Sequence, residues 1–392
     1  MKRISDLEKK YVMEALNNEF RTSLKDAFAS KLEQQFAEKF NCSFAISHVN
    51  GTATMHTALA ALGVGVGDEV IVPPLTMSST ALSVLQNQSI PVFADVDKNT
   101  FNIDPAAILK SITPRTKAVI TVALYGLSPD YDKIKKICQE HHLFLIEDNA
   151  ECFLGYYGNK MVGSFGDFSS FSFQASKHMT CGEGGILLTN NEDLADKARR
   201  FSSLGYAGIS GKKGKISKSD IQDPNYDRHL TLGFNYRMSD INAAVALGQL
   251  ERLEQLVNQR KKVGKLFDLA IDDISFIEKQ FIPKNYIHSF WTYAFILNTD
   301  NCDKDWFTFR DIFKKNGGDH YYAAWKLSYN EPLFKENIQF KTYIWQKYKP
   351  GLCPNAEFLQ PRMIQLKTNY WNLKEAERQA EVLHKSLEEF NG

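Results

Sequence analysis

Apolar and polar residues alternate along this chain in two rhythms that predict its secondary structure. From about Ser43 onward, short β-rich apolar runs are followed by longer stretches with helical spacing. Strands that alternate with helices of this length imply right-handed crossovers and a mainly parallel sheet. The predicted strands are 44–47, 69–72, 91–95, 117–122 and 143–147, and the predicted helices are 52–62, 77–85, 105–111 and 131–141.

The rhythm changes after residue 167. Residues 168–173 and 185–189 have the pattern of two further strands, with only a glycine-rich segment between them. Because that connection is too short for a parallel crossover, one of the two strands is expected to run antiparallel. The sequence therefore predicts an α/β domain built on a mostly parallel, mixed sheet of seven strands.

The two ends of the chain differ from this central part. Residues 1–40 are charged with helical spacing, and a helix at 239–267 is expected to bridge two packed units. The 392 residues exceed the size at which one core stops growing. The expected apolar contacts of the first segment are Leu7, Val12, Leu16, Leu32 and Phe36. The predicted units are an arm (1–40), a large α/β domain (41–255) and a small α+β domain (256–392) that ends in a helix at 374–390.

Charge and cysteine content exclude several classes of partner. A formal charge of +1 gives no bulk electrostatic drive towards nucleic acid or an acidic membrane. The 6 cysteines form no C-x-x-C pair, so neither a metal site nor a disulfide scaffold is predicted. Charges throughout residues 1–20 leave no apolar signal region, and no run is long enough to span a membrane. A cytoplasmic enzyme with reduced thiols is expected.

Lys177 is the first candidate for chemistry. It follows the strand predicted at 168–173 and precedes three glycines, Gly182, Gly184 and Gly185, so its amine lies where backbone can approach a ligand closely. Lysine amines that react in such places usually form Schiff bases. A surface lysine beside a turn is the more common alternative when this motif stands alone.

Asp148 favours a reactive Lys177 over the alternative of a surface lysine. The apolar run 144–146 ends in Glu147 and Asp148, which places a carboxylate at the carboxyl end of a strand. Ligands bind at that edge in open α/β sheets, and a carboxylate there can pair with a protonated pyridine nitrogen.

Three further segments reach the same edge. Gly51, Thr52 and Ala53 open a helix after the first strand, where free N–H groups can hold a phosphate; an ordinary cap by Asn50 or Thr52 is the alternative. Ser172 could add a phosphate contact or be bonded in a turn. Met77 could lie against a flat ring or fill a core.

These motifs together resemble the DegT/DnrJ/EryC1/StrS aminotransferases. The resemblance covers about 43–260, and many ordered motifs carry it. They are 51–53, 65–73, 95–97, 102–104, 113–118, 124–126, 146–148, 163–167, 171–185 and 235–239. It implies the fold of aspartate aminotransferase, fold type I of the enzymes that use pyridoxal 5'-phosphate.

The resemblance also implies roles for individual residues. Lys177 matches the lysine that binds the cofactor covalently, and Asp148 matches the acid that keeps the pyridine nitrogen protonated. Glu151 stands near the ring hydroxyl and Ala150 beneath the ring, while Met77 occupies a position often filled by an aromatic residue. The matched phosphate contacts are Gly51, Thr52, Ala53 and Ser172 from one subunit and Asn235 from the partner in a homodimer with shared active sites.

The implied reaction moves an amino group from glutamate to a keto sugar. A nucleotide-linked 4-keto or 3-keto deoxysugar is expected, as in perosamine-type enzymes of surface-polysaccharide or glycan biosynthesis; a free sugar or inosose is the alternative. A dehydratase of the same architecture would have histidine in place of Lys177, and a non-catalytic regulator would be expected to lose Lys177 or Asp148. A nucleotide binder of another kind is disfavoured, since neither a P-loop nor G-x-G-x-x-G follows the first strand.

Two basic features leave alternatives open. Lys212, Lys213 and Lys215 could bind the diphosphate of such a sugar or form a solvated, mobile loop within 208–226. His178 could tune the neighbouring amine, but a turn histidine bonded to backbone is favoured.

Overall fold

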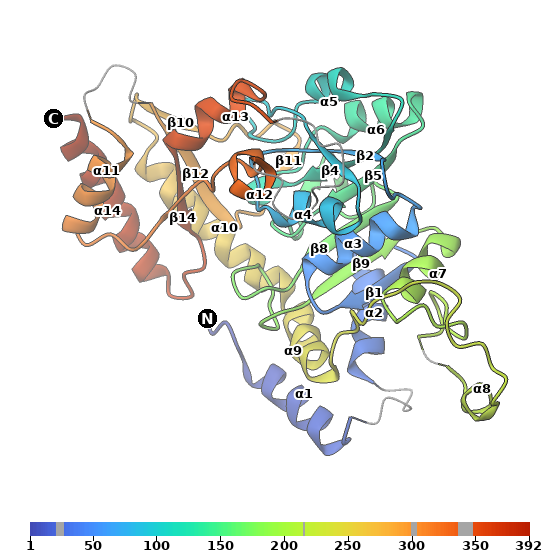
Figure 1. The fold of residues 1–392 in the computed structure, drawn as a ribbon. Helices are drawn as coiled ribbons and strands as arrows, with labels where there is room; N and C mark the ends of the chain where they lie inside the picture. Colours follow the sequence, from blue (N-terminus) through green and yellow to red (C-terminus); the bar gives the residue numbers. More distant parts are fainter. Residues whose placement is uncertain (21–26, 215, 299–303, 336–347) are drawn as a thin grey trace.

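A large mixed sheet forms the centre of the molecule (Figure 1). The computed structural model describes residues 1–20, 27–214, 216–298, 304–335 and 348–392. The large sheet is seven-stranded, in the order β1-β9-β8-β5-β4-β2-β3. Its strands are β1 (Phe44–His48), β2 (Glu69–Val72), β3 (Ile90–Phe93), β4 (Thr116–Val122), β5 (Phe144–Asp148), β8 (Phe168–Ser172) and β9 (Gly185–Thr189).

The strand directions follow the predicted pattern. Strands β3, β2, β4, β5 and β8 pair in parallel, whereas β9 pairs antiparallel with both β8 and β1. The short connection after β8 therefore does reverse the chain, and β9 is the antiparallel strand. The predicted mostly parallel, seven-stranded sheet is confirmed.

Alternate side chains along each strand point to opposite faces of the sheet and pack in separate cores there. Val70 and Val72 of β2 pack in one buried cluster, whereas Ile71 between them packs in another. The first face carries α3 (Gly51–Ala61), α4 (Ser79–Gln86) and α7 (Glu192–Phe201). The opposite face is covered by α5 (Pro105–Ser111) and α6 (Tyr131–Glu140) at one end and by α2 (Phe28–Lys39) and α9 (Asp240–Glu251) at the other.

The arm at the start of the chain packs on α9. Helix α1 (Asp6–Asn17) begins with a capping box in which Ser5 and Glu8 bond each other's backbone. Of the predicted apolar contacts, Leu32 and Phe36 are fully buried and Leu7 and Val12 are half-buried. The prediction for Leu16 is wrong: its side chain is 43% exposed, because Ala15 is the residue that α1 turns towards α9.

The predicted helix 239–267 is two helices. Arg252 separates α9 from α10 (Leu253–Ala270), with φ −110 and ψ 10 in place of helical values. Its guanidinium donates to Glu8 (2.7 Å) and to the carbonyl of Lys2 (2.6 Å), so the start of the chain is bound at this break. Helical spacing continues across the break, which explains why the apolar pattern did not reveal it.

The C-terminal part forms a second layer beside α10 (Figure 1). Its sheet has the order β10-β12-β14-β13 and is antiparallel throughout. The elements are β10 (Ile277–Lys279), β12 (Thr292–Leu297), α11 (Trp306–Lys315), β13 (Tyr322–Ala323), α12 (Pro332–Lys335), α13 (Pro354–Leu359), β14 (Met363–Lys367) and α14 (Leu373–Asn391). The proposed boundary at about 255 falls inside α10 and stays a prediction.

Smaller elements complete the described chain. A three-stranded sheet joins β11 (Tyr286–Ile287) to β6 (Tyr156–Tyr157) and β7 (Lys160–Met161). The segment 208–226, predicted as a loop, contains the short helix α8 (Lys218–Gln222), and Lys215 lies outside the described residues. Within the described ranges, no helix combines the length and apolar character needed to cross a bilayer.

Glu147 organises the chain that returns from β7 to β8. Its buried carboxylate accepts N–H groups from Gly163 (2.9 Å), Phe165 (2.7 Å) and Gly166 (2.9 Å) and the hydroxyl of Ser169 (2.6 Å). An ionised carboxylate offers acceptors only, which suits a site lined by donors.

We predict that Glu147→Gln lowers the free energy of unfolding by about 2 kcal/mol, because the amide presents N–H donors to N–H groups that lose their acceptor. Urea unfolding monitored by circular dichroism measures this change. Glu140→Gln is the control, since the exposed Glu140 makes a long ion pair with Lys136 at 3.9 Å. Equal stability of the two variants would contradict the assigned role.

Candidate active site

The carboxyl ends of the central strands open into a cavity of about 380 Å³. Asp148 ends β5, Ser172 ends β8, and Gly51 and Thr52 begin the helix that follows β1. Parallel strands bring these ends to one edge of the sheet. All four residues line the cavity together with Lys177, Glu151, Ala150 and Met77.

Lys177 reaches this cavity from the turn after β8. Its side chain is nearly buried, and Nζ lies 3.3 Å from Oε1 of Glu151. On another side, Nζ lies 4.1 Å from the centroid of the Trp291 ring, within the range of a cation–π contact. A carboxylate and an indole face therefore hold the amine inside the cavity.

The two acids of the site are both fully enclosed. Asp148 accepts hydrogen bonds from the Thr80 hydroxyl (2.9 Å) and the Ala150 N–H (3.2 Å). Burial raises the pKa of Asp148, and these hydrogen bonds together with the positive charge of Lys177 oppose that shift. Burial also raises the pKa of Glu151 despite its ion pair with Lys177. A cationic partner in the cavity would stabilise the ionised form of either acid.

The start of α3 offers an anion site beside Ser172. The first N–H groups of a helix have no partner inside the helix, and a negative group near them is favoured by the helix dipole. A Cβ on Gly51 would lie 2.9 Å from Cβ of Ser172, so only glycine lets the helix approach the serine this closely. An amine, a buried acid and an anion site around one cavity match the aldehyde, pyridine nitrogen and phosphate of pyridoxal phosphate.

Three predicted residues behave differently from the rest. The Ala53 N–H is bound by Asn50 Oδ1 at 2.8 Å, so the Asn50 cap is present and Ala53 does not line the cavity. Asn235 is exposed and also does not line the cavity of this chain. Met77 lines the cavity with 46% of its surface exposed. The cofactor roles of these residues, like those of the other predicted site residues, remain predictions.

His178 lies outside the cavity. Its ring is buried, Nε2 lies 3.0 Å from the carbonyl of Ser289, and burial lowers its pKa well below the usual value. It is the backbone-bonded histidine that the sequence favoured.

The sequence did not identify several residues of the site, two of which come from the C-terminal half. Trp291 faces Lys177 and precedes β12, and Trp325 also lines the cavity. Thr80, which holds Asp148, lies in α4. The aromatic run 290–295 was visible in the sequence, but nothing in it indicated that the Trp291 ring lies against the Lys177 amine.

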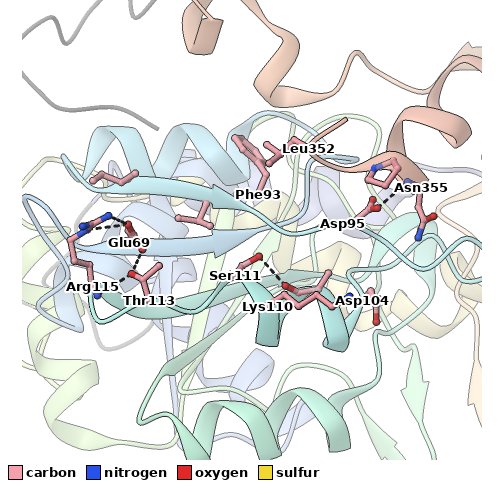
Figure 2. A pocket seen from close by; sticks show the side chains of 14 residues that line it. Glu69, Phe93, Asp95, Asp104, Lys110, Ser111, Thr113, Arg115, Leu352 and Asn355 are labelled. Carbon is pink, nitrogen blue, oxygen red and sulfur yellow. Dashed lines mark hydrogen bonds and ion pairs between the residues drawn. The ribbon is translucent and has the colours of Figure 1, made fainter. Parts of the chain in front are cut away.

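A larger cavity of about 810 Å³ lies along the edge strand β3 (Figure 2). Several of its polar groups are bound to one another: Glu69 pairs with Arg115 and Thr113, and Asp95 accepts N–H groups from Asn355 (2.9 Å) and Ala356 (3.0 Å). Among the described residues that line it, the only lysine, Lys110, is exposed, in contrast to the nearly buried Lys177, so volume alone does not identify the site.

The fold and site define a chain of the aminotransferase type. A family profile matches residues 2–385, and the chain belongs to the DegT/DnrJ/EryC1/StrS aminotransferase family. The resemblance inferred from the motifs is confirmed. Members of this family depend on pyridoxal phosphate.

Three comparisons define the similarity more closely. The chain is 40% identical over 252 residues to GDP-perosamine synthase of Caulobacter vibrioides, covering 64% of each chain. It is 38% identical over 246 residues to the spore coat polysaccharide biosynthesis protein SpsC of Bacillus subtilis, covering 62% of this chain and 61% of that one. The chain thus spans somewhat less than two thirds of the length of these two relatives.

The third comparison concerns the fold of the whole chain. The X-ray structure of the aminotransferase from Psychrobacter cryohalolentis superposes with a TM-score of 0.87 at 25% identity, covering 99% of this chain and 98% of that one. The predicted fold class is confirmed by this neighbour.

We predict that Asp148→Asn stabilises the cofactor-free protein at neutral pH. Because its folded pKa is raised, Asp148 contributes stability below its unfolded pKa of about 3.9, and this contribution is lost as pH rises through the folded value. Asparagine avoids that loss, since its amide can still accept from Ala150 and donate to Thr80.

Urea unfolding at pH about 7 and about 4 tests this prediction. The variant should exceed the wild type at the higher pH, and the difference should shrink at the lower one. The exposed Asp132→Asn serves as the control and should change little at either pH. A variant less stable than the wild type at neutral pH would contradict the prediction, because it would show that burial does not make the ionised form of Asp148 unfavourable.

Proposed function

We propose that this protein transfers an amino group from glutamate to a keto sugar, with pyridoxal phosphate bound at Lys177. The convergence of Lys177, Asp148 and the start of α3 on one cavity carries this proposal. Each of these groups would serve a different chemical part of that cofactor, namely the aldehyde, the pyridine nitrogen and the phosphate. Lysine in this position also favours a transaminase over the dehydratase alternative, which the family resemblance associates with histidine, and retention of both Lys177 and Asp148 disfavours a non-catalytic regulator.

Each residue of the site would have a separate role in the reaction. When bound, pyridoxal phosphate supplies the aldehyde carbon that takes up the amino group and a ring that withdraws electrons. Lys177 provides the nucleophilic amine and, once released, can move a proton to or from the substrate carbon. Glu151 holds that amine at 3.3 Å. Asp148 would supply a negative charge to the pyridine nitrogen, and Gly51, Thr52 and Ser172 would hold the phosphate.

The relatives support a nucleotide-linked sugar as the amino acceptor. One is named for GDP-perosamine synthesis and another for spore coat polysaccharide biosynthesis. We therefore propose a nucleotide-linked 4-keto or 3-keto deoxysugar that enters a surface polysaccharide or glycan. A free sugar or inosose is the alternative acceptor.

We further propose a homodimer in which Asn235 reaches the partner's phosphate site. Around Asn235 the chain exposes large apolar side chains: Leu230 (58%), Leu232 (80%) and Phe234 (38%). Exposed apolar residues gathered in one segment are typical of an interface. A second copy of this chain would cover them and bring Asn235 to a cavity that it does not line within its own chain.

We expect purified protein given pyridoxal phosphate to transfer nitrogen from glutamate labelled with heavy nitrogen to one member of a panel of nucleotide-linked keto sugars. Mass spectrometry of the products identifies the acceptor. Lys177→Ala should reduce the rate by at least about 10³-fold, because both the nucleophile and the proton carrier are lost.

Lys212→Ala provides a matched control, since this lysine is exposed and pairs with Glu192 at 2.7 Å. It should retain covalent binding of the cofactor. A wild type that binds no pyridoxal phosphate, or a Lys177→Ala variant with wild-type turnover, would refute the proposed activity. Transfer to an inosose but to no nucleotide sugar would support the alternative acceptor.

Mixing inactive Lys177→Ala and Asn235→Ala subunits should restore part of the activity. In the mixed dimer, one of the two sites then has both an intact lysine and an intact asparagine, so up to about a quarter of wild-type activity is expected in a one-to-one mixture. Native mass spectrometry confirms that mixed dimers form. Mixed dimers without any recovered activity would argue against a shared site.

A further inference from the structure

The main chain that carries Lys177 is held by donors from distant parts of the protein. We call residues 175–177 the lysine turn. Arg260 on α10 donates Nη2 to the carbonyls of Ser176 (2.8 Å) and Lys177 (3.0 Å). Trp291 donates Nε1 to the same Ser176 carbonyl at 3.0 Å. Arg3 of the N-terminal arm donates to the carbonyls of Ala175 and Lys177.

Arg260 also fixes the second group that holds the amine. Its Nη1 donates to the carbonyl of Trp291 (2.7 Å) and to Oγ1 of Thr368 (3.2 Å). The Trp291 ring is the surface that lies 4.1 Å from Nζ of Lys177. One guanidinium therefore binds both the turn from which the lysine side chain starts and the residue against which that side chain ends.

Burial of the Arg260 guanidinium is energetically unfavourable, which indicates that its position serves a function. Arg260 is only 1% exposed, and no carboxylate among the described residues pairs with it. Burial, with the charge of Arg3 nearby, lowers its pKa to about 9. A buried cation without a counter-charge is destabilising. Such departures from the most stable choice are expected at functional positions.

We infer that Arg260 is a positioning residue that sets where the Lys177 amine lies in the cavity, through the lysine turn and Trp291. This inference rests on the proposed function, because it concerns the bond between Lys177 and pyridoxal phosphate. Within the described chain, the hydrogen bonds of Arg260 go to none of Asp148, Glu151 and the start of α3, so cofactor binding and amine placement are separable.

Cofactor binding and placement of the Lys177 amine can be measured separately, without measuring turnover. Saturating pyridoxal phosphate is added, and total bound cofactor is compared with the fraction trapped by borohydride on the Lys177 peptide. Nζ condenses with the aldehyde carbon and releases water, and hydride then reduces the carbon–nitrogen double bond. We expect Arg260→Met to bind the cofactor but to reduce the trapped fraction to about a tenth of the wild-type value. Arg260→Lys should lie between the two.

Gln259→Met is the matched control. Gln259 also lies on α10 and donates from a buried side chain to a backbone carbonyl, that of Tyr370 (2.8 Å), but this bond does not reach the lysine turn. It should lower thermal stability and leave the trapped fraction unchanged. Should Arg260→Met not fold, Trp291→Phe removes one donor to the turn and keeps a ring face, and a fall of about threefold is expected.

The outcomes separate the two levels of proposal. A trapped fraction at the wild-type value in Arg260→Lys and in Trp291→Phe, with stability alone reduced, would overturn the positioning role and leave the proposed function intact. A wild type that traps no cofactor at Lys177 would overturn the proposed function itself.

Discussion

The buried pair of Lys177 and Glu151 is the interaction on which the rest of the site depends. An amine that must react inside a cavity needs partners that hold it without neutralising it permanently, and here a carboxylate at 3.3 Å and an indole face at 4.1 Å provide them. The carboxylate comes from the turn after β5 of the large sheet and the indole from the C-terminal part. The reactive amine therefore lies where the two parts of the chain meet, and both must be in place to hold it.

The architecture explains why the remaining groups are close by. Parallel strands deliver their carboxyl ends to one edge, so Asp148 and Ser172 arrive together with the start of α3. The antiparallel strand β9 then allows β1 to join the sheet next to it, which places Gly51 against Ser172. Burial of both acids is unfavourable for the cofactor-free chain, and a cationic ring in the cavity would remove that penalty.

The network around Arg260 adds a second level of control. Hydrogen bonds from α10, from the residue before β12 and from the N-terminal arm all end on the lysine turn. A change in the packing of any of these elements would be transmitted to the amine through the backbone and not through the cavity wall.

The sequence by itself determined the order of strands and helices, the reversal after residue 173, and Lys177 and Asp148 as candidates. These follow from local periodicity and from residues at strand ends, which short-range patterns encode. It also supplied the family, because many ordered motifs recur together. Only the tertiary structure decided that α9 and α10 separate at Arg252, that Leu16 is exposed, and that Trp291 and Arg260 serve the lysine. Those features depend on contacts between residues far apart in the chain, such as Arg252 with Glu8 and Arg260 with Lys177. The periodicity within a single helix or strand does not encode such long-range contacts.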